Sequence, residues 1–304
     1  MCLYVDANNL AARCYFAQME LFTLDGRRSG GIHGFFKSLA ALRSQLNVEN
    51  EKTCIFWDGG RSKFRTDLYP EYKQGRKLNN PKTEREIAIA QDYKTTLKEI
   101  KKALKFRPIR QVDVEGVEAD DLIAVMAHTV EEPVVVHSGD KDMCQLASQR
   151  VTVLDPKKGI RKPEEIAQDF GLPLFDRDRL LLARAIIGDV SDNVKGIKGI
   201  GEKRAAKVMP YLKQDGYLVY QDRPCSHGPT QKLIDRVIEE QDIIKRNIDL
   251  MRLPFVWTDI YYEPQQMESA MVQFLEVPEA NWPAFVQFLD EWELEEVKED
   301  LARL

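Results

Sequence analysis

GVEADDLIAVMAHTVEEPVVVHSGDKD, residues 116–142, joins one helix-like run to one strand-like run, and acidic residues border each of them. Apolar residues recur at helical spacing in its first half, whereas VVVH (134–137) is a short apolar run typical of a strand buried on both faces. Two similar runs are LYVD (3–6) and CIFWD (54–58). Helical periods lie between these runs, so the sequence predicts an α/β protein with a mainly parallel central sheet flanked by helices.

Acidic residues follow each of these strands and also open one helix. Asp6 and Asp58 end the first two runs, Asp140 follows VVVH, and Glu118 precedes the helical run. The carboxyl ends of parallel strands share one edge of a sheet, and ligands bind at that edge. Capping or turn chemistry explains any one acid but not the repetition. With a further pair in IIGDVSDN, the candidate metal ligands are Asp6, Asp58, Glu118, Asp120, Asp121, Asp140, Asp142, Asp189 and Asp192.

So many carboxylates in one cleft predict bound cations, because an unpaired buried charge costs several kcal/mol or more. Oxygen ligands without histidine or cysteine suit Mg²⁺ or Mn²⁺ and argue against zinc. Two such ions about 4 Å apart are a known device for hydrolysing phosphodiesters. The acids therefore predict a site for two divalent ions.

Composition limits the class of protein. The 304 residues are 43% hydrophobic and 31% charged, which suits one large or two smaller globular domains. Five cysteines without a CxxC pair favour free thiols in a reducing compartment, and neither a leader peptide nor a membrane span is expected. The net charge is −5, yet residues 61–105 hold thirteen basic and six acidic residues. This segment is a candidate DNA-binding surface or, alternatively, a solvated helix face.

A second candidate DNA-binding segment is NVKGIKGIGEKRAAKVM, residues 193–209. Its glycines can bring backbone N–H groups toward an anion, and the next helix is expected to begin near Glu202. The pattern is that of a helix-hairpin-helix, with a glycine-rich linker as the alternative. The residues expected to bind duplex DNA here are Gly196, Lys198, Gly199, Gly201, Lys203 and Arg204.

These segments together resemble the 5′-nuclease, or flap endonuclease, family, most closely the stand-alone 5′-to-3′ exonucleases of bacteriophages and the 5′-nuclease domain of bacterial DNA polymerase I. Over residues 1 to about 210 the resemblance is carried by VDANN, FWDGG, FRTDLYPEYKQGRK, GVEADD, SGDKD and IIGDVSDNVKGIKGIGEKRAA. It implies a PIN-like fold with a helical arch over about 61–105 and a helix-hairpin-helix. We expect an α/β nuclease core over 1–180, and the DNA-binding region with a mostly helical C-terminal part over 181–304.

The resemblance also implies roles for single residues. The first six of the nine acids, up to Asp140, would surround one metal ion, and the remaining three would surround the second. At the entry of the arch, Tyr72, Lys73 and Arg76 are the catalytic candidates, with the lysine stabilising charge on the phosphate and the tyrosine stacking an unpaired base. The residues expected to guide the DNA strand are Arg61, Lys63, Arg65 and Lys77.

By the same resemblance, the expected activity is two-metal hydrolysis of DNA at a 5′ flap, or at a 5′ end joined to duplex, in replication or repair. Mg²⁺ would be the cofactor, with Mn²⁺ as a substitute, and a monovalent cation at the hairpin is left open. An RNA–DNA hybrid as substrate and replication proteins as partners also stay open.

We expect a cytoplasmic protein of a bacterial cell or a phage-infected host. The alternatives are a PIN-type endoribonuclease and an inactive scaffold that binds DNA junctions. We expect the tail from Trp282 to pack on the core, the alternative being a dock for a replication protein.

Overall fold

The computed structural model describes residues 1–75, 83–254 and 262–302. Its helices are α1 (Ala7–Ala17), α2 (Gly30–Leu46), α3 (Lys63–Leu68), α4 (Glu84–Leu104), α5 (Ala119–Thr129), α6 (Pro163–Asp169), α7 (Arg177–Ile187), α8 (Glu202–Val208), α9 (Gly228–Glu239), α10 (Gln241–Met251), α11 (Pro264–Leu275), α12 (Trp282–Glu291) and α13 (Glu295–Ala302). Its strands are β1 (Cys2–Asp6), β2 (Thr53–Trp57), β3 (Arg110–Asp113), β4 (Val134–His137), β5 (Val151–Asp155), β6 (Gly159–Arg161), β7 (Gly188–Asp189), β8 (Val194–Lys195), β9 (Leu212–Asp215) and β10 (Leu218–Gln221).

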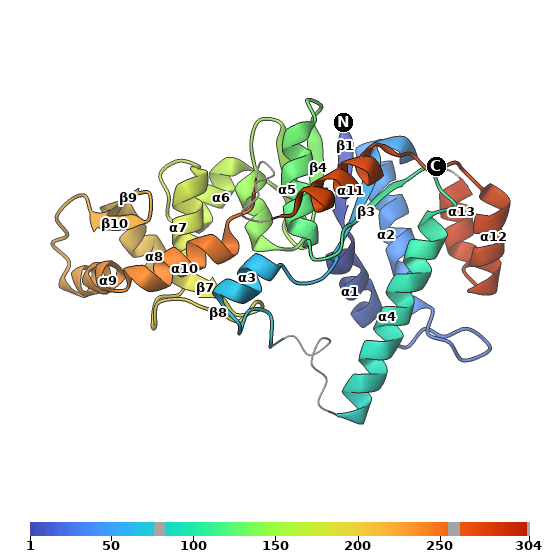
Figure 1. Ribbon diagram of the computed structural model, residues 1–304, viewed down its shortest axis with the longest axis horizontal. Coiled ribbons are helices and arrows are strands. Elements are labelled where there is room, and N and C mark those ends of the chain that lie inside the picture. Colours follow the sequence, from blue (N-terminus) through green and yellow to red (C-terminus); the bar gives the residue numbers. More distant parts are fainter. Residues whose placement is uncertain (76–82, 255–261, 303–304) are drawn as a thin grey trace.

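A six-stranded sheet in the order β3-β2-β1-β4-β5-β6 lies at the centre of the molecule (Figure 1). The first five strands are parallel, and β6 pairs antiparallel with β5. This confirms the predicted mainly parallel sheet, and the three predicted strands match β1, β2 and β4 to within one residue. The chain runs outward from β1 to β3 and then returns to β4, so the sheet's topological switch point lies between β1 and β4.

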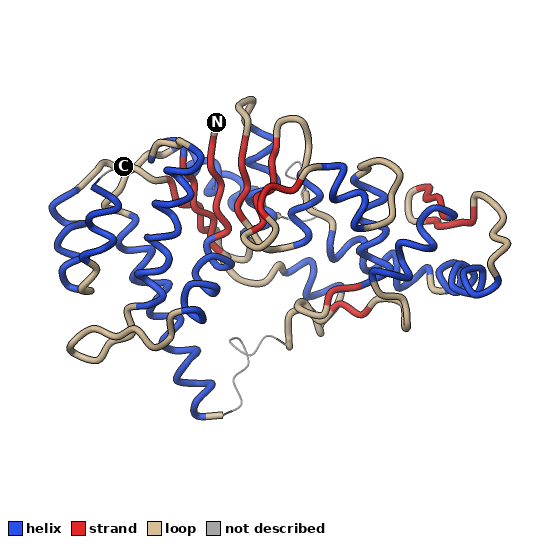
Figure 2. The backbone as a smooth tube through the Cα atoms, turned by 180° about the vertical axis from the view of Figure 1, so that it is seen from behind, coloured by secondary structure: helices blue, strands red, loops and turns tan. Residues whose placement is uncertain are grey.

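Both faces of the sheet are buried, because successive side chains of a strand point to opposite faces. On β1, Leu3 and Val5 pack with α1, α2, α4 and α12, whereas Tyr4 packs on the other face with α5 and α11. β2 repeats the alternation, with Ile55 on the first face and Phe56 on the second. The strands of the sheet lie between helices (Figure 2). Because both faces are covered, the strands are near-continuous apolar runs, which is why the sequence located them.

α4 begins at a tip that projects from the molecule and runs from there to the sheet domain (Figure 1). The apolar stripe of its second half, including Ile100 and Leu104, is buried in the core. Lys101 at this end forms an ion pair with Asp113. The second half of α4 therefore belongs to the core of the sheet domain. The arch over about 61–105 stays a prediction, and residues 76–82 of it lie outside the described residues.

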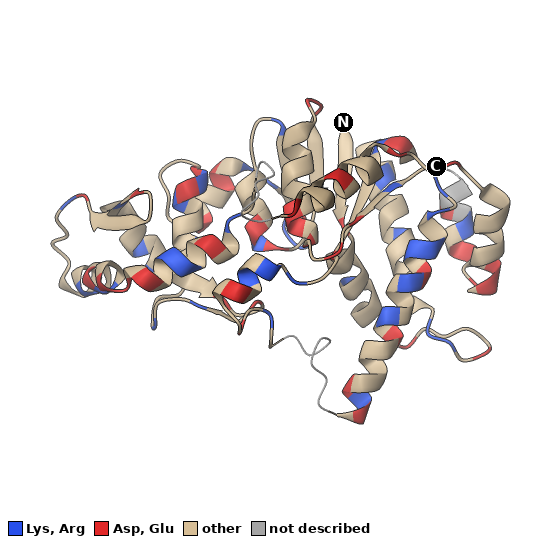
Figure 3. Cartoon of the chain, viewed as in Figure 1, with Lys and Arg blue, Asp and Glu red and all other residues tan. Residues whose placement is uncertain are grey.

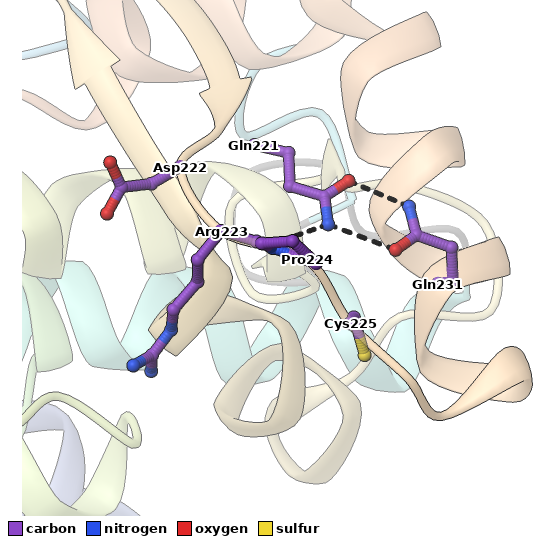
Figure 4. Close-up of a pocket in the computed structure, with 6 residues that line it drawn as sticks. All are labelled: Gln221, Asp222, Arg223, Pro224, Cys225 and Gln231. Carbon is purple, nitrogen blue, oxygen red and sulfur yellow. Dashed lines mark hydrogen bonds between the residues drawn. The ribbon is translucent and has the colours of Figure 1, made fainter.

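A second lobe, formed by α6–α10 and the small strands β7–β10, extends from the β4–β6 side of the sheet (Figure 1). The stretch 217–232, which matches no motif, contributes β10 and the start of α9. A pocket of about 460 Å³ lies there, and the amides of Gln221 and Gln231 bond to each other across it (Figure 4). This pocket is at the end of the lobe, far from the acid-bearing rim.

The C-terminal helices α11–α13 return to the sheet domain. Phe274 of α11 packs on Tyr4 and Phe56, and Phe285 and Phe288 of α12 pack on α2. The expected packing of the tail on the core is confirmed. The helical part that we placed with residues 181 onward is thus divided between the second lobe and the sheet.

Candidate active site at the carboxyl edge of the sheet

Asp6 and Asp140 lie at the switch point between β1 and β4. Asp6 accepts a hydrogen bond from the Ser138 hydroxyl at 2.8 Å through Oδ2, and its Oδ1 caps α1 by accepting from the Asn9 amide at 3.0 Å. Asp140 accepts from the Asp142 amide at 2.8 Å and so caps the turn that follows. Capping thus accounts for one oxygen of each aspartate, as turn chemistry predicts, but the arrangement also brings the two carboxylates to one edge.

The start of α5 forms the densest acidic group. Oxygens of Glu118, Asp120 and Asp121 lie within 4.8 Å of one another, and this is the one such trio among the described residues. Glu118 occupies the N-cap position without a side-chain capping bond, and Asp58 accepts from the Ala119 amide at 3.0 Å instead. The crowding therefore does not result from N-terminal capping by Glu118.

Arg65 compensates part of this group from within the protein. Its guanidinium donates to Asp121 at 2.6 and 2.7 Å and to Glu118 at 2.8 Å, and also to the Leu250 carbonyl of α10 at 2.8 Å. Only 3% of Arg65 is exposed. We expected this arginine to guide the DNA strand; the structure corrects that, because its planar fork matches two carboxylates and is sealed from solvent.

Tyr72 and Lys73 lie at the acidic group, as the resemblance implied, but in an unexpected orientation. Lys73 Nζ is 2.9 Å from Glu118 and 3.8 Å from Asp192, and it lies 5.0 Å from the centre of the Tyr72 ring. The Tyr72 hydroxyl donates to Glu118 at 3.0 Å and to Asp192 at 3.4 Å. The tyrosine ring is buried, so its face is not open to a base in this structure.

The remaining acids surround a second buried cation. Arg184 of α7 donates to Asp142 at 2.9 Å through Nε and to Asp189 at 2.7 Å through Nη2. Asp189 also accepts from the Ser191 amide at 2.7 Å. The sequence analysis missed Arg184, although one charge inside the apolar run LLLARAIIG of α7 was a signal for it. This group is arranged around an arginine and does not form a compact set of metal ligands by itself.

Burial and mutual repulsion raise the pKa of several carboxyls. Burial, with the nearby Asp58 carboxylate, raises the pKa of Asp6 to about 6. Burial, with Asp142 as the nearest like charge, raises the pKa of Asp140 to about 7. The pKa of Asp120 is raised well above its ordinary value for the same reasons. These carboxyls are under-compensated, which is the condition that a bound cation relieves.

Glu118 shows the opposite balance. Burial alone would raise its pKa, but Lys73 and Arg65 lower it to about 2. Compensation is thus uneven: Glu118 is held ionised, while Asp6, Asp120 and Asp140 retain excess negative potential.

The donor set fits hard divalent cations. All three members of the dense group offer carboxylate oxygens, and no histidine or cysteine joins them in a ligand cluster within the described residues. Three buried cations, Arg65, Lys73 and Arg184, contact this edge, against nine carboxylates. Acidic residues occur on many elements, and those at the start of α5 are among them (Figure 3).

The predicted helix-hairpin-helix is formed by α7, a short turn with β7 and β8, and α8, which begins at the expected Glu202. Gly196 packs against the end of α7, where a Cβ would lie 2.2 Å from the Ile187 carbonyl oxygen, so its place here is set by chain packing. The other hairpin candidates are exposed: Lys198, Gly199, Gly201, Lys203 and Arg204. Arg61 and Lys63 are exposed too, whereas Arg76 and Lys77 lie outside the described residues.

A family model described as the 5′-3′ exonuclease, N-terminal resolvase-like domain, matches residues 1–171, which is more than half of the chain. The chain belongs to this family. Thermostable DNA polymerase I of Thermus caldophilus is 34% identical over 256 residues, which cover 83% of this chain and 28% of that protein. The chain thus spans under a third of the length of this curated relative.

Solved structures show the same fold. The 5′-exonuclease of T5, recorded with bound divalent metal ions, superposes with a TM-score of 0.71 at 22% identity, covering 91% of this chain and 99% of that one. The catalytic core of Rad2 in complex with DNA substrate gives a TM-score of 0.59 at 16% identity, covering 99% of this chain and 91% of that one. Among the described helices, none is both long and apolar enough to cross a membrane.

Sequence reasoning about the family motifs missed three polar residues that position the acids. Asn8 accepts the Asp58 amide at 3.1 Å through its side chain, Asn9 accepts the Gly139 amide at 3.1 Å, and Ser138 donates to Asp6. Each lies two or three residues from a predicted ligand, in VDANN or SGDKD. Their types were a usable signal, since short polar side chains beside a strand end commonly fix the neighbouring backbone.

Proposed function

We propose that this exonuclease-family chain is a divalent-metal-dependent nuclease that hydrolyses DNA phosphodiester bonds at a 5′ flap or a 5′ end joined to duplex. One observation carries the proposal: acids from β1, β2, β4 and α5 converge on one edge, with Glu118, Asp120 and Asp121 within 4.8 Å of one another. Divalent ions at such a site would activate a water and stabilise the leaving oxygen. We favour Mg²⁺ because every donor is an oxygen, and we expect two ions.

The chain's own residues support distinct parts of this activity. Asp6, Asp120 and Asp140 have the least internal compensation and are our candidates for direct ligands. Lys73, 2.9 Å from Glu118, can transfer its hydrogen bond to a phosphate oxygen that arrives beside this group. Arg65 holds Glu118 and Asp121 in place, and Arg184 holds Asp142 and Asp189. The exposed Lys198, Lys203 and Arg204 are proposed to contact the duplex backbone, without reading bases.

The test is a product-length analysis of a labelled 5′-flap substrate with and without Mg²⁺. We expect release of the flap as short products in Mg²⁺ or Mn²⁺ and no cleavage in chelator. A single-stranded RNA of equal length is the comparison substrate. Cleavage of the RNA alone would favour a PIN-type endoribonuclease and overturn the proposal.

One observation favours the second candidate, an inactive scaffold that binds DNA junctions. Arg65 and Arg184 each pair with two of the acids, so part of the negative charge of the site is balanced without metal. Flap binding without turnover at any Mg²⁺ or Mn²⁺ concentration would establish this role instead.

The activity is proposed to operate in the cytoplasm of a bacterial cell or a phage-infected host. Relatives from Thermus and Bacillus support a bacterial setting. Cleavage of RNA–DNA hybrids, a monovalent cation at the hairpin and binding of replication proteins stay predictions. Cleavage of the hybrid is measured with a substrate whose 5′ strand is RNA annealed to DNA. Dependence on a monovalent cation is measured by replacing potassium in the buffer with a larger organic cation.

A further inference from the structure

The entry of the arch is fastened directly to the hairpin of the second lobe. We call residues 69–75 the arch base and residues 188–195 the turn of the hairpin. The Lys73 amide donates to the Asp192 carbonyl at 2.8 Å, and the Asn193 side chain donates through Nδ2 to the Glu71 carbonyl at 2.9 Å. The two segments are more than a hundred residues apart in sequence, yet lie side by side below the sheet edge (Figure 1).

Arg246 of α10 contacts both segments. The Arg246 guanidinium of α10 lies 4.6 Å from the centre of the Tyr69 ring, and its Nη2 donates to the Lys195 carbonyl at 3.0 Å. Tyr69, near the start of the arch base, thus contacts an arginine that is bonded to the turn of the hairpin, and Lys73 is bonded to the turn itself. This makes the fastening two-sided.

The strength of these contacts differs. The Lys195–Glu71 ion pair spans 3.1 Å, but its side chains are 71% and 52% exposed, so it contributes little. The bonds to main-chain carbonyls are stronger candidates, because they fix backbone position directly. Two of these bonds join the arch base to the turn directly, and of these two the Asn193 bond is the one that comes from a side chain and can be removed by substitution.

Asn193 is well suited to this contact. Its backbone has a φ of +58°, a conformation that asparagine tolerates better than most residues other than glycine. The residue it helps to hold is itself unusual: Lys73 has a φ of +56° and reaches Glu118 from that backbone. A non-glycine residue persists in such a conformation when its surroundings over-determine it.

We propose that the turn of the hairpin holds the arch base, and that Asn193 is the positioning residue that keeps Lys73 at the acidic group. This inference rests on the proposed nuclease function for its kinetic consequence, although the contact itself does not. It assigns the hairpin a second role beside duplex binding: it couples the docking of DNA to the placement of the lysine that faces the phosphate.

The test compares Asn193→Gly with Asn47→Gly. Glycine can keep the positive φ of Asn193 and removes its side-chain amide donor. The control is Asn47, an exposed asparagine with a φ of +50° at the end of α2, on the far side of the sheet domain. Hydrogen exchange of peptides containing the Lys73 amide measures release of the arch base without any substrate. We expect about fivefold faster exchange in Asn193→Gly, the loss of one typical hydrogen bond, and no change in Asn47→Gly.

The kinetic arm uses the same variants on the 5′ flap. We expect a single-turnover rate about fivefold lower in Asn193→Gly, with a Kd for the flap in chelator within about twofold of the parent. Equal exchange in both variants, or an effect confined to Kd, would overturn the proposal, the latter because Asn193 would then be a DNA contact. If the parent protein cuts no flap, the proposed function fails, while the exchange experiment still decides the fastening.

Discussion

At the scale of single side chains, the candidate site is a balance between repulsion among carboxylates and compensation by buried cations. Glu118 has two cationic neighbours and a pKa of about 2, whereas Asp6 and Asp140 have pKa values near 6 and 7. The excess negative charge thus falls on particular oxygens. These are the ones that gain most from a bound cation.

This balance predicts how stability depends on pH. A carboxyl whose pKa is raised by folding binds its proton more tightly in the folded protein than in the unfolded chain. Its contribution to the free energy of unfolding is therefore complete below the ordinary pKa and is lost as the pH rises through the folded pKa. Without metal, the protein should therefore lose stability between about pH 4 and 7, as Asp6 and Asp140 ionise. Mg²⁺ should raise the Tm more at pH 8 than at pH 5.5, measured by thermal unfolding with and without chelator. An equal Mg²⁺ effect at both pH values would contradict it.

Asp140→Asn separates charge from shape at one position. The amide oxygen of the asparagine can still accept the hydrogen bond from the Asp142 amide, but the side chain at position 140 no longer ionises near pH 7. We expect the metal-free variant to be about as stable as the parent at pH 5.5 and more stable at pH 8, with flap cleavage abolished and flap binding retained. Thermal unfolding and fluorescence anisotropy measure these. A variant that is less stable at both pH values would show that the carboxylate has a structural role.

Arg65→Met should have the largest effect on stability among changes near the site. It leaves Asp121 without its buried counter-charge and Glu118 with Lys73 alone, a loss of about 3–5 kcal/mol in the free energy of unfolding at pH 7. Lys63→Met, on the same short helix but 90% exposed at its side chain, is the matched control and should change stability by about 0.5 kcal/mol or less. Similar urea midpoints for the two variants would refute the compensating role of Arg65.

At the scale of elements, the last helices complete the core of the sheet domain. Phe285 of α12 is fully buried and meets Phe36 of α2 with ring centres 5.5 Å apart. The apolar face of α2 would otherwise be open to water. Helices that are distant in sequence are thus parts of one cooperative layer.

Phe285→Ala should accordingly cost about 3–5 kcal/mol of unfolding free energy, measured by urea denaturation. Val272→Ala on α11, with 57% of its valine exposed, is the control and should cost far less. A small effect of both substitutions would mean that α12 docks weakly and contributes little to the core.

At the scale of the whole molecule, basic residues are divided between the hairpin and α4. Lys198 is exposed in the hairpin loop, whereas Lys105 is exposed at the end of α4 remote from the acids (Figure 1). Lys198→Ala should reduce the salt slope of flap binding by about one and Lys105→Ala should leave it unchanged. Titrations from about 50 to 200 mM salt measure the slope. Equal losses would indicate a DNA path along α4.

Sequence reasoning was most successful where burial dictates residue type. VVVH and LYVD are apolar on both faces of a strand, and the GIG before Glu202 marks a helix start, so β4, β1 and α8 were located closely. It was least successful where function depends on partners in space. Arg65 and Arg184 look like ordinary basic residues in sequence, and only the fold reveals that each faces two carboxylates.

Arg65 and Arg184 have one further consequence, for folding of the protein before a metal ion binds. Because these counter-ions are built into the polypeptide, newly synthesised molecules can mature in a magnesium-poor environment and wait there intact. Stripping the ions with a chelator should silence the protein reversibly, and dialysis back into magnesium should restore its full rate. The magnesium concentration would then change the rate of the proposed activity more than it changes the fraction of folded protein.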